Sequence, residues 1–138
     1  MTPTAKMVVR EQCPDVDALA GLFFEAAEVE ARLPRVLRDK IRACWPDAPD
    51  DWQAFGWHEV QAPPRPATPS EVTRYDLALQ ITPLVPEDDR RLIWAVAHSA
   101  VRRERGPAWH KLARIIGLHP STIKRRFESA IIELYYKI

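Results

Sequence analysis

The sequence predicts an all-α protein of about six helices, and three observations lead to this prediction. Apolar residues recur at intervals of three and four along most of the chain, which is the spacing of one helix face. No stretch alternates apolar and polar residues convincingly, and residues that favour strands are not clustered. Proline and glycine fall between the periodic stretches, where they end one helix or begin the next.

The first half of the chain is expected to contain two helices after a short arm. Residues 1–12 show no sustained helical pattern and are expected to be a flexible arm. A helix should begin near Asp15 and run to about Arg32, with a wide apolar side that is typical of a core helix. A second helix is expected from Arg35 to about Cys44.

A loop and a spacer are expected to follow these two helices. Trp52, Phe55 and Trp57 lie in an acidic loop that is interrupted by prolines. Packing of these rings on the core is the favoured interpretation, and an exposed partner-binding patch is the alternative. Residues 63–69 contain four prolines, which predicts an extended spacer over residues 61–68 in the middle of the chain.

Two more helices are expected after this spacer. Thr68 and Glu71 form the capping-box pattern of a helix start, and that helix should end before Pro83. The next helix should begin at Pro86, because three acidic residues in its first turn suit the positive end of a helix dipole. We expect this helix to run to about Glu104.

The most informative segment is the last part of the chain, residues 108–136. A short helix there should carry Leu112, Ala113 and Ile116 on its buried face. Gly117 follows, and glycine ends a helix with little strain because it accepts a positive φ. The segment therefore predicts one short helix and a tight turn.

A second helix is predicted directly after the turn. Leu118 is expected to fill the core at the turn, His119 is placed to cap the helix, and Pro120 suits its first position. The buried stripe of this helix should consist of Ile123, Phe127, Ala130, Ile131 and Leu134. A short helix, a turn with glycine and a second helix with a basic run are the layout of a DNA-binding helix-turn-helix.

This layout predicts a set of DNA-binding residues. The first turns of the second helix reach base edges, where arginine can pair with guanine, while lysine and hydroxyl groups can bind phosphate. The predicted DNA-binding residues are Lys111, Arg114, His119, Ser121, Thr122, Lys124, Arg125 and Arg126. A packed helical hairpin with a solvated basic face is the alternative interpretation.

The charge distribution favours DNA binding. Residues 90–138 contain 11 Lys and Arg against 3 acidic residues, a net charge of +8, whereas residues 1–89 contain 9 against 16, a net charge of −7. A basic block is the expected footprint of phosphate contacts. We therefore divide the chain into an acidic interaction or dimerisation part at residues 13–60 and a DNA-binding part at residues 69–138.

Other classes of function find little support in the sequence. The four histidines and two cysteines show no metal-ligand spacing, and the four glycines form no phosphate-binding loop. Three aspartates between prolines are interpreted as a solvated loop: Asp47, Asp50 and Asp51. We expect no enzymatic activity, cofactor or metal. A cytoplasmic protein with reduced thiols is expected, because no signal peptide or membrane-spanning segment is apparent.

The order of these parts resembles an uncharacterised family of short proteins from alphaproteobacteria and their phages, described only as a domain of unknown function. The similarity covers about residues 15–138, and residues 101–105 add basic residues where that family is shorter. The matching segments are residues 25–27, 33–34 and 45–46, the proline-rich spacer, and residues 69–71, 86–95 and 109–130.

The second half also resembles the promoter-binding C-terminal domain of sigma factors and LuxR-type regulators. The resemblance rests on Thr122-Ile-Lys-Arg-Arg126 and on Ala130-Ile131. It implies a four-helix DNA-reading unit from about Pro69 to Ile138. It does not imply sigma-factor activity, because no equivalent of the region that melts promoters is present.

The function that the sequence predicts is a sequence-specific DNA-binding protein, a bacterial or phage transcriptional regulator that reads duplex DNA with the helix starting at Pro120. A homodimer is expected, because affinity and site length usually come from two half-sites. One alternative is a DNA-recognition subunit of a phage packaging machine. The other is an adaptor that binds RNA polymerase or another regulator through the acidic half.

Overall fold

Helices account for most of the residues that the computed structural model describes, namely residues 4–33, 65–101 and 103–138. These ranges contain six α-helices, one short 3₁₀ helix and no strand, which confirms the predicted all-α fold class. The expected helix over residues 35–44 lies outside the described residues. The sixth helix is instead one that the sequence did not predict.

That additional helix is α1 (Ala5–Gln12), and it shows that the expectation of a flexible arm was wrong for this stretch. An isolated helix of eight residues is marginal in water, so local helix propensity did not predict it. Val9 is fully buried, and Cys13 just after the helix is 2% exposed. Burial of these two side chains in the common core stabilises α1.

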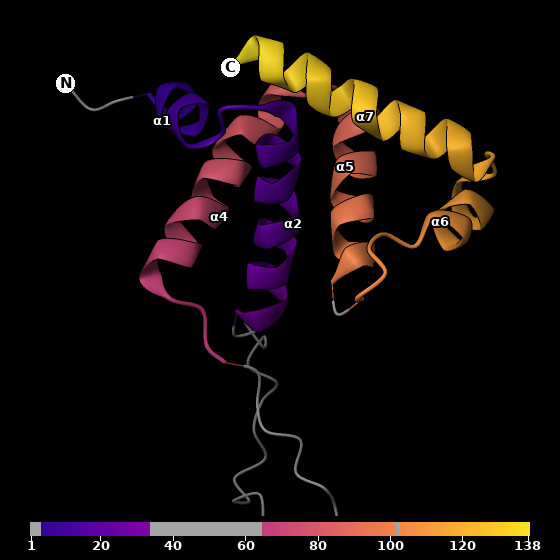
Figure 1. Cartoon of the computed structure of the whole chain (residues 1–138), viewed down its shortest axis with the longest axis horizontal. Coiled ribbons are helices and arrows are strands. Elements are labelled where there is room, and N and C mark those ends of the chain that lie inside the picture. The colour runs from indigo at the N-terminus through magenta and orange to yellow at the C-terminus, as the bar shows by residue number, and fades with distance from the viewer. Residues whose placement is uncertain (1–3, 34–64, 102) are drawn as a thin grey trace, which may run out of the picture.

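The central element of the bundle is α2 (Val16–Arg32), which starts and ends where the sequence predicted. The side chain of Asp15 caps it by accepting a hydrogen bond of 2.7 Å from the backbone N–H of Ala18. Figure 1 shows α4 and α5 on either side of α2, with α7 running across the ends of these helices. The helix buries Leu19, Leu22, Phe23, Ala26, Ala27 and Val29.

α4 and α5 pack on the buried side of α2. α4 (Pro69–Ile81) ends before Pro83 as predicted and continues into the 3₁₀ helix Thr82–Leu84. α5 (Glu87–Ala100) is shorter than expected, because it stops at Ala100 rather than near Glu104. 

The early end of α5 has a visible cause in the chain that follows it. The hydroxyl of Ser99 donates to the carbonyl of Val96 and accepts a hydrogen bond of 3.1 Å from the backbone N–H of Ala108. The connection to α6 is thereby held against the last turn of α5. The contact with Ala108 could not be read from helical spacing, because Ser99 and Ala108 are nine residues apart.

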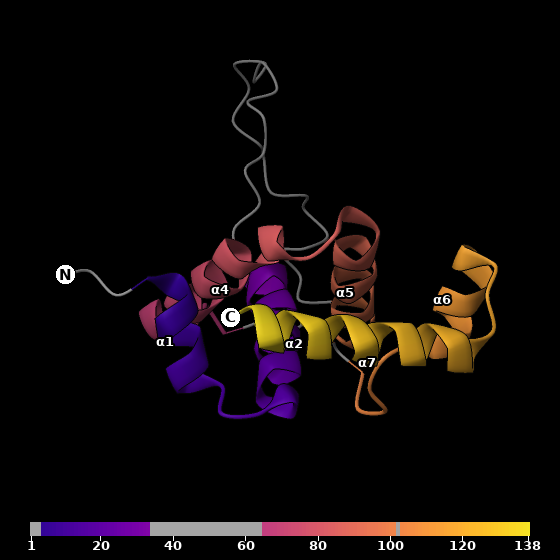
Figure 2. The same cartoon turned by 90° about the horizontal axis from the view of Figure 1, so that it is seen from above.

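The last two helices are α6 (Trp109–Ile116) and α7 (Pro120–Lys137). The carboxyl half of α7 is fixed to the body, because the Tyr135 hydroxyl donates to the carbonyl of Pro14 at 2.8 Å. Lys6 Nζ also donates to the carbonyl of Lys137 at 3.0 Å. Figure 2 shows that the amino half of α7 and the whole of α6 project beyond α5.

One core unites the described residues of the two halves. Buried side chains from α1, α2, α4, α5, α6 and α7 form a single contiguous cluster. Trp94 of α5 packs against it: its ring meets Phe23 of α2 edge-on, with centroids 5.5 Å apart. The expected limit between residues 13–60 and 69–138 is therefore not a limit between two cores, since α2 packs on the helices of the second half.

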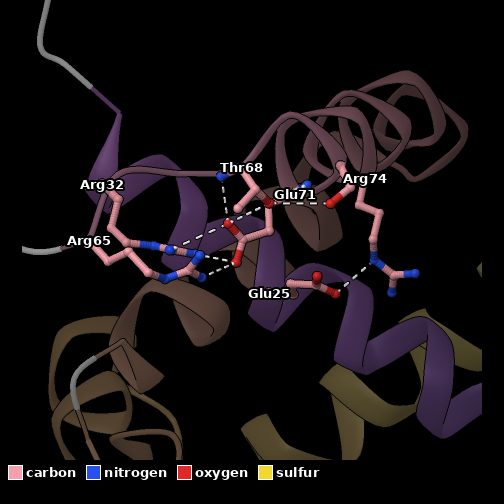
Figure 3. A network of polar contacts seen from close by, with 7 residues as sticks. Glu25, Arg32, Arg65, Thr68, Glu71 and Arg74 are labelled. Carbon is pink, nitrogen blue, oxygen red and sulfur yellow. Dashed lines mark hydrogen bonds and ion pairs between the residues drawn. The ribbon is translucent and has the colours of Figure 1, made fainter.

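Glu71 connects the end of α2 to the beginning of α4 (Figure 3). Its Oε1 lies 3.0 Å from Arg32 Nη2 and 2.7 Å from Arg65 Nη2. Its Oε2 accepts the backbone N–H of Thr68 at 2.7 Å, while the Thr68 side chain accepts the backbone N–H of Glu71 at 3.4 Å. This confirms the predicted capping box and adds two arginines to it.

These contacts lower the pKa of Glu71 to about 2 from an ordinary value of 4.5. The backbone hydrogen bond from Thr68 contributes most, followed by the hydrogen bond from Arg32. A carboxylate whose pKa is lower in the folded state stabilises the fold above its unfolded pKa. That contribution is lost as the pH falls toward the folded pKa.

We therefore expect acidification to remove the stabilising effect of Glu71 between about pH 4.5 and pH 2. Thermal unfolding of the wild type and of Glu71→Gln across this range measures it. The difference in Tm should be largest near neutral pH and should shrink as the pH falls. Glu87→Gln removes an exposed carboxylate that pairs with Arg91 and serves as the control. A Tm difference for Glu71→Gln that stays constant with pH would contradict the assignment.

Candidate nucleic-acid interface

The turn between α6 and α7 has the local geometry that the sequence predicted. Gly117 ends α6 in the left-handed conformation, with φ 80°, and its N–H donates to the carbonyl of Ala113 at 2.8 Å. His119 Nδ1 caps α7 by accepting the backbone N–H of Ser121 at 3.3 Å, and Pro120 occupies the first helical position. Two helices are thus joined by a short and conformationally fixed connection.

Replacing Gly117 with alanine is expected to destabilise the protein by about 1–2 kcal/mol. An added Cβ would meet nothing within 4 Å, so the loss would come from the backbone conformation alone. Urea denaturation of the variant measures it. Gly117→Asn should lose less, because asparagine tolerates the left-handed conformation better. Equal stability of the alanine variant and the wild type would contradict this reading of the turn.

The face of α7 that points into the bundle is the predicted one. All five residues of its stripe are buried: Ile123, Phe127, Ala130, Ile131 and Leu134. Trp109, at the start of α6, is half-buried and packs edge-on against Phe127 with centroids 5.9 Å apart. Trp109 therefore packs the start of α6 against α7.

Two apolar residues near the turn are more exposed than expected. Ile116 is 42% exposed and Leu118 is 41% exposed, although both were predicted to lie in the core. α6 has only eight residues and lies at the projecting end of the bundle, so its last turn is only partly covered. The two side chains instead line a shallow groove of about 300 Å³ that they share with Leu92 and Ala95 of α5.

All eight predicted DNA-binding residues are exposed and lie on the projecting end of the bundle. Arg125 lies two residues from Ile123 and two from Phe127, both buried, so it points directly away from the core. Ser121 precedes it by one turn on the same outward face. The exposed set is Lys111 and Arg114 on α6, and His119, Ser121, Thr122, Lys124, Arg125 and Arg126 at the start of α7.

Arg126 is the member of this set whose position differs from the expectation. Its Nε lies 2.9 Å from Asp89 Oδ1, so the side chain is held against the first turn of α5 rather than free. The sequence interpretation missed Asp89 because the two residues are 37 positions apart. The sequence indicated this partner only through the acidic first turn of α5, and that turn is also explained by the helix dipole. While this ion pair lasts, Nε of Arg126 is engaged and only its Nη groups could contact phosphate.

Four of the predicted cations remain available for a ligand. Across residues 4–33, 65–101 and 103–138, no carboxylate lies within ion-pairing distance of Lys111, Arg114, Lys124 or Arg125. The positive end of the α7 dipole lies beside them. This end of the molecule can therefore attract an anionic ligand such as a phosphate backbone.

Other chemistry is not suggested by the described ranges. Within them, no group of histidine, cysteine and acidic residues is arranged to hold a metal ion. A search of the described helices finds none with the length and apolar character that a bilayer-crossing helix needs. The aromatic residues proposed as a weak partner-binding patch lie outside the described residues: Trp52, Phe55 and Trp57.

Comparison with known proteins places the chain in a family but does not supply a function. Neither a characterised protein nor a solved structure matches the chain significantly. A family model does match, and it covers residues 31–134, which includes α4, α5, α6 and most of α7. The chain therefore belongs to the family described as a domain of unknown function (DUF6362).

Proposed function

We propose that this protein binds duplex DNA and reads its sequence with the first turns of α7. The observation that carries the proposal is the set of four exposed cations without an ion pair in the described ranges. They lie on α6 and in the first turns of α7, at the end of the molecule that projects beyond α5 (Figure 2): Lys111, Arg114, Lys124 and Arg125. The net charge of +8 over residues 90–138 supports the same conclusion.

Each side chain has a role that follows from its position. The major groove admits an α-helix, and the residues on the outward face of its first turns reach the base edges. Arg125 stands at the middle of that face and would read guanine, with Ser121 and Thr122 beside it. Lys124 on the flank of α7, together with Lys111 and Arg114 on α6, would bind phosphates.

A transcriptional regulator of bacterial or phage origin is the function that fits this mode of binding. One recognition helix covers only a short site, so tight and specific binding generally requires two half-sites and a symmetric dimer. We therefore propose that the protein acts as a homodimer on DNA.

Selection from a randomised duplex library, at low and at physiological salt, tests the proposal. An enriched motif is expected, with an affinity that falls as salt rises. Three phosphate contacts per protomer predict a slope of log K against log salt of about −2.7 per half-site. If no motif is enriched and binding disappears at physiological salt, α6 and α7 are a scaffold and the proposal is wrong.

A further inference from the structure

A second surface of interest runs along the exposed face of α2. One hollow of about 680 Å³ lies between the carboxyl half of α2 and the described part of the connection that follows α5, at residues 101 and 103–107. Another of about 520 Å³ lies between the amino half of α2 and α7. Phe24 and Pro107 line both hollows, so the two adjoin each other. We call this surface the α2 groove; its α2 wall includes Asp17, Ala20, Phe24 and Glu28.

Gly21 lies in the interior of α2 on the same face as the groove. It follows Asp17 by one turn and precedes Phe24 by one turn. Glycine in the middle of a helix destabilises it by about 1 kcal/mol relative to alanine. A Cβ at this position would meet nothing within 4 Å, so no close contact inside the described chain requires glycine here. A close approach of another backbone to α2 would require it.

The floor of the groove is aromatic. Phe24 of α2 lies against Phe127 of α7 with ring centroids 6.0 Å apart, and Trp109 lies against the same Phe127 at 5.9 Å. Phe24 and Trp109 are both only half-buried, so their rings offer apolar surface to an occupant. Such a floor suits large aliphatic or aromatic side chains.

The rim of the groove is predominantly acidic. Among the described residues, its basic lining residues are Arg103 and Lys124. Glu25 also lines it but pairs with Arg74 at 2.9 Å. Four other carboxylates line the groove and have no ion pair in the described ranges: Asp17, Glu28, Glu104 and Glu128. An occupant that carries positive charge is therefore favoured over one that carries negative charge.

We propose that the α2 groove binds a basic amphipathic helix of a partner protein. The apolar face of that helix packs on Phe24 and Trp109, its backbone approaches α2 at Gly21, and its lysines or arginines face the acidic rim. Asp17 and Glu28 are separated by about 16 Å along α2, which matches three turns of a bound helix. The proposal does not depend on DNA binding, because its contacts centre on α2, although Lys124 at the edge of the groove also belongs to the proposed DNA surface.

The test uses the full-length protein without DNA and a synthetic 18-residue peptide of leucine and lysine. Leucine stands at i, i+3, i+4 and i+7 in the peptide, and a second peptide has glutamate in place of lysine. Binding is followed by NMR chemical shifts and by calorimetry. We expect the lysine peptide to shift the amides around Gly21 and Phe24, and the glutamate peptide to bind at least about tenfold more weakly.

Variants at Gly21 separate binding from stability. Gly21→Ala should raise the Tm, because alanine favours the helix and its Cβ has space, yet it should weaken peptide binding. Gly21→Leu should weaken binding at least about tenfold by blocking the close approach. Gln80→Leu adds the same side chain to an exposed position of α4 and is the matched control. Glu28→Lys on the rim should also weaken binding, and it serves if Gly21→Leu does not fold.

Three results would overturn the proposal. The first is a lysine peptide that fails to bind, or that binds no more tightly than the glutamate peptide. The second is unchanged affinity in both Gly21→Leu and Glu28→Lys. The third is a wild-type dimer in light scattering that becomes a monomer in Gly21→Leu, since a second copy of the chain would then occupy the groove. The DNA motif should be the same in the wild type and Gly21→Leu, so failure here is distinguishable from failure of the proposed function.

Discussion

Replacing Phe23 with alanine is expected to lower the free energy of unfolding by about 3–5 kcal/mol. Phe23 is 1% exposed, and it lies on the buried face of α2 where that helix contacts α4 and α5. Its ring also makes the edge-on contact with Trp94. Alanine would leave a cavity at the centre of the core and would remove this aromatic contact. A loss of this size is a large part of the total stability of a small domain.

Urea denaturation followed by far-UV circular dichroism and by tryptophan fluorescence measures this effect. Because one core includes α2 and the helices of the second half, both signals should report the same transition in the wild type and in Phe23→Ala. Phe24→Ala is the matched control: its ring is half-buried, so its loss should be clearly smaller. Equal losses for the two variants would contradict the central position of Phe23.

The second large effect is expected at the proposed DNA-reading surface. Arg125→Ala should remove about 1–3 kcal/mol of discrimination at one base pair, because a bidentate contact to guanine would be lost. Lys124→Ala should weaken binding to all sequences alike and should reduce the salt slope by about 0.9, which corresponds to one phosphate contact. Arg125→Ala should therefore change the base preference, whereas Lys124→Ala should change the overall affinity and its salt dependence.

Fluorescence anisotropy on the selected motif and on single-base variants of it, at several salt concentrations, distinguishes these outcomes. Arg10→Ala removes an exposed cation on α1, away from the proposed surface, and should change neither specificity nor slope. Unchanged affinity in both Arg125→Ala and Lys124→Ala would rule out DNA reading by α7.

Helix boundaries that depend on local capping were predictable from the sequence. Asp15 begins α2, Thr68 with Glu71 begins α4, and Gly117 ends α6, in each case through hydrogen bonds or a backbone conformation of neighbouring residues. Exposure of the residues on the outward face of α7 was equally predictable. Helical spacing alone identifies that face once the buried stripe from Ile123 to Leu134 is recognised.

Features that depend on distant parts of the chain were not predictable in this way. α1 is held by burial of Val9 and Cys13 among residues that come later in the sequence. Arg126 forms an ion pair with Asp89 of α5. The exposure of Leu118 depends on where α6 ends relative to α5. The aromatic floor of the α2 groove also combines residues of three helices, so periodicity within one helix could not indicate it.

Because α7 is one unbroken helix, a change of its direction at one end displaces its other end. Its carboxyl end is fixed where Tyr135 meets Pro14, and Ser121 lies about 21 Å away along the same axis. A change of about 5° in the direction of the helix would displace its first turn by about 2 Å relative to its carboxyl end, and the burial of Ile123 and Phe127 opposes such a change. The packing of α7 from Ile123 to Leu134, together with the contacts at its carboxyl end, therefore determines the position of its exposed first turn.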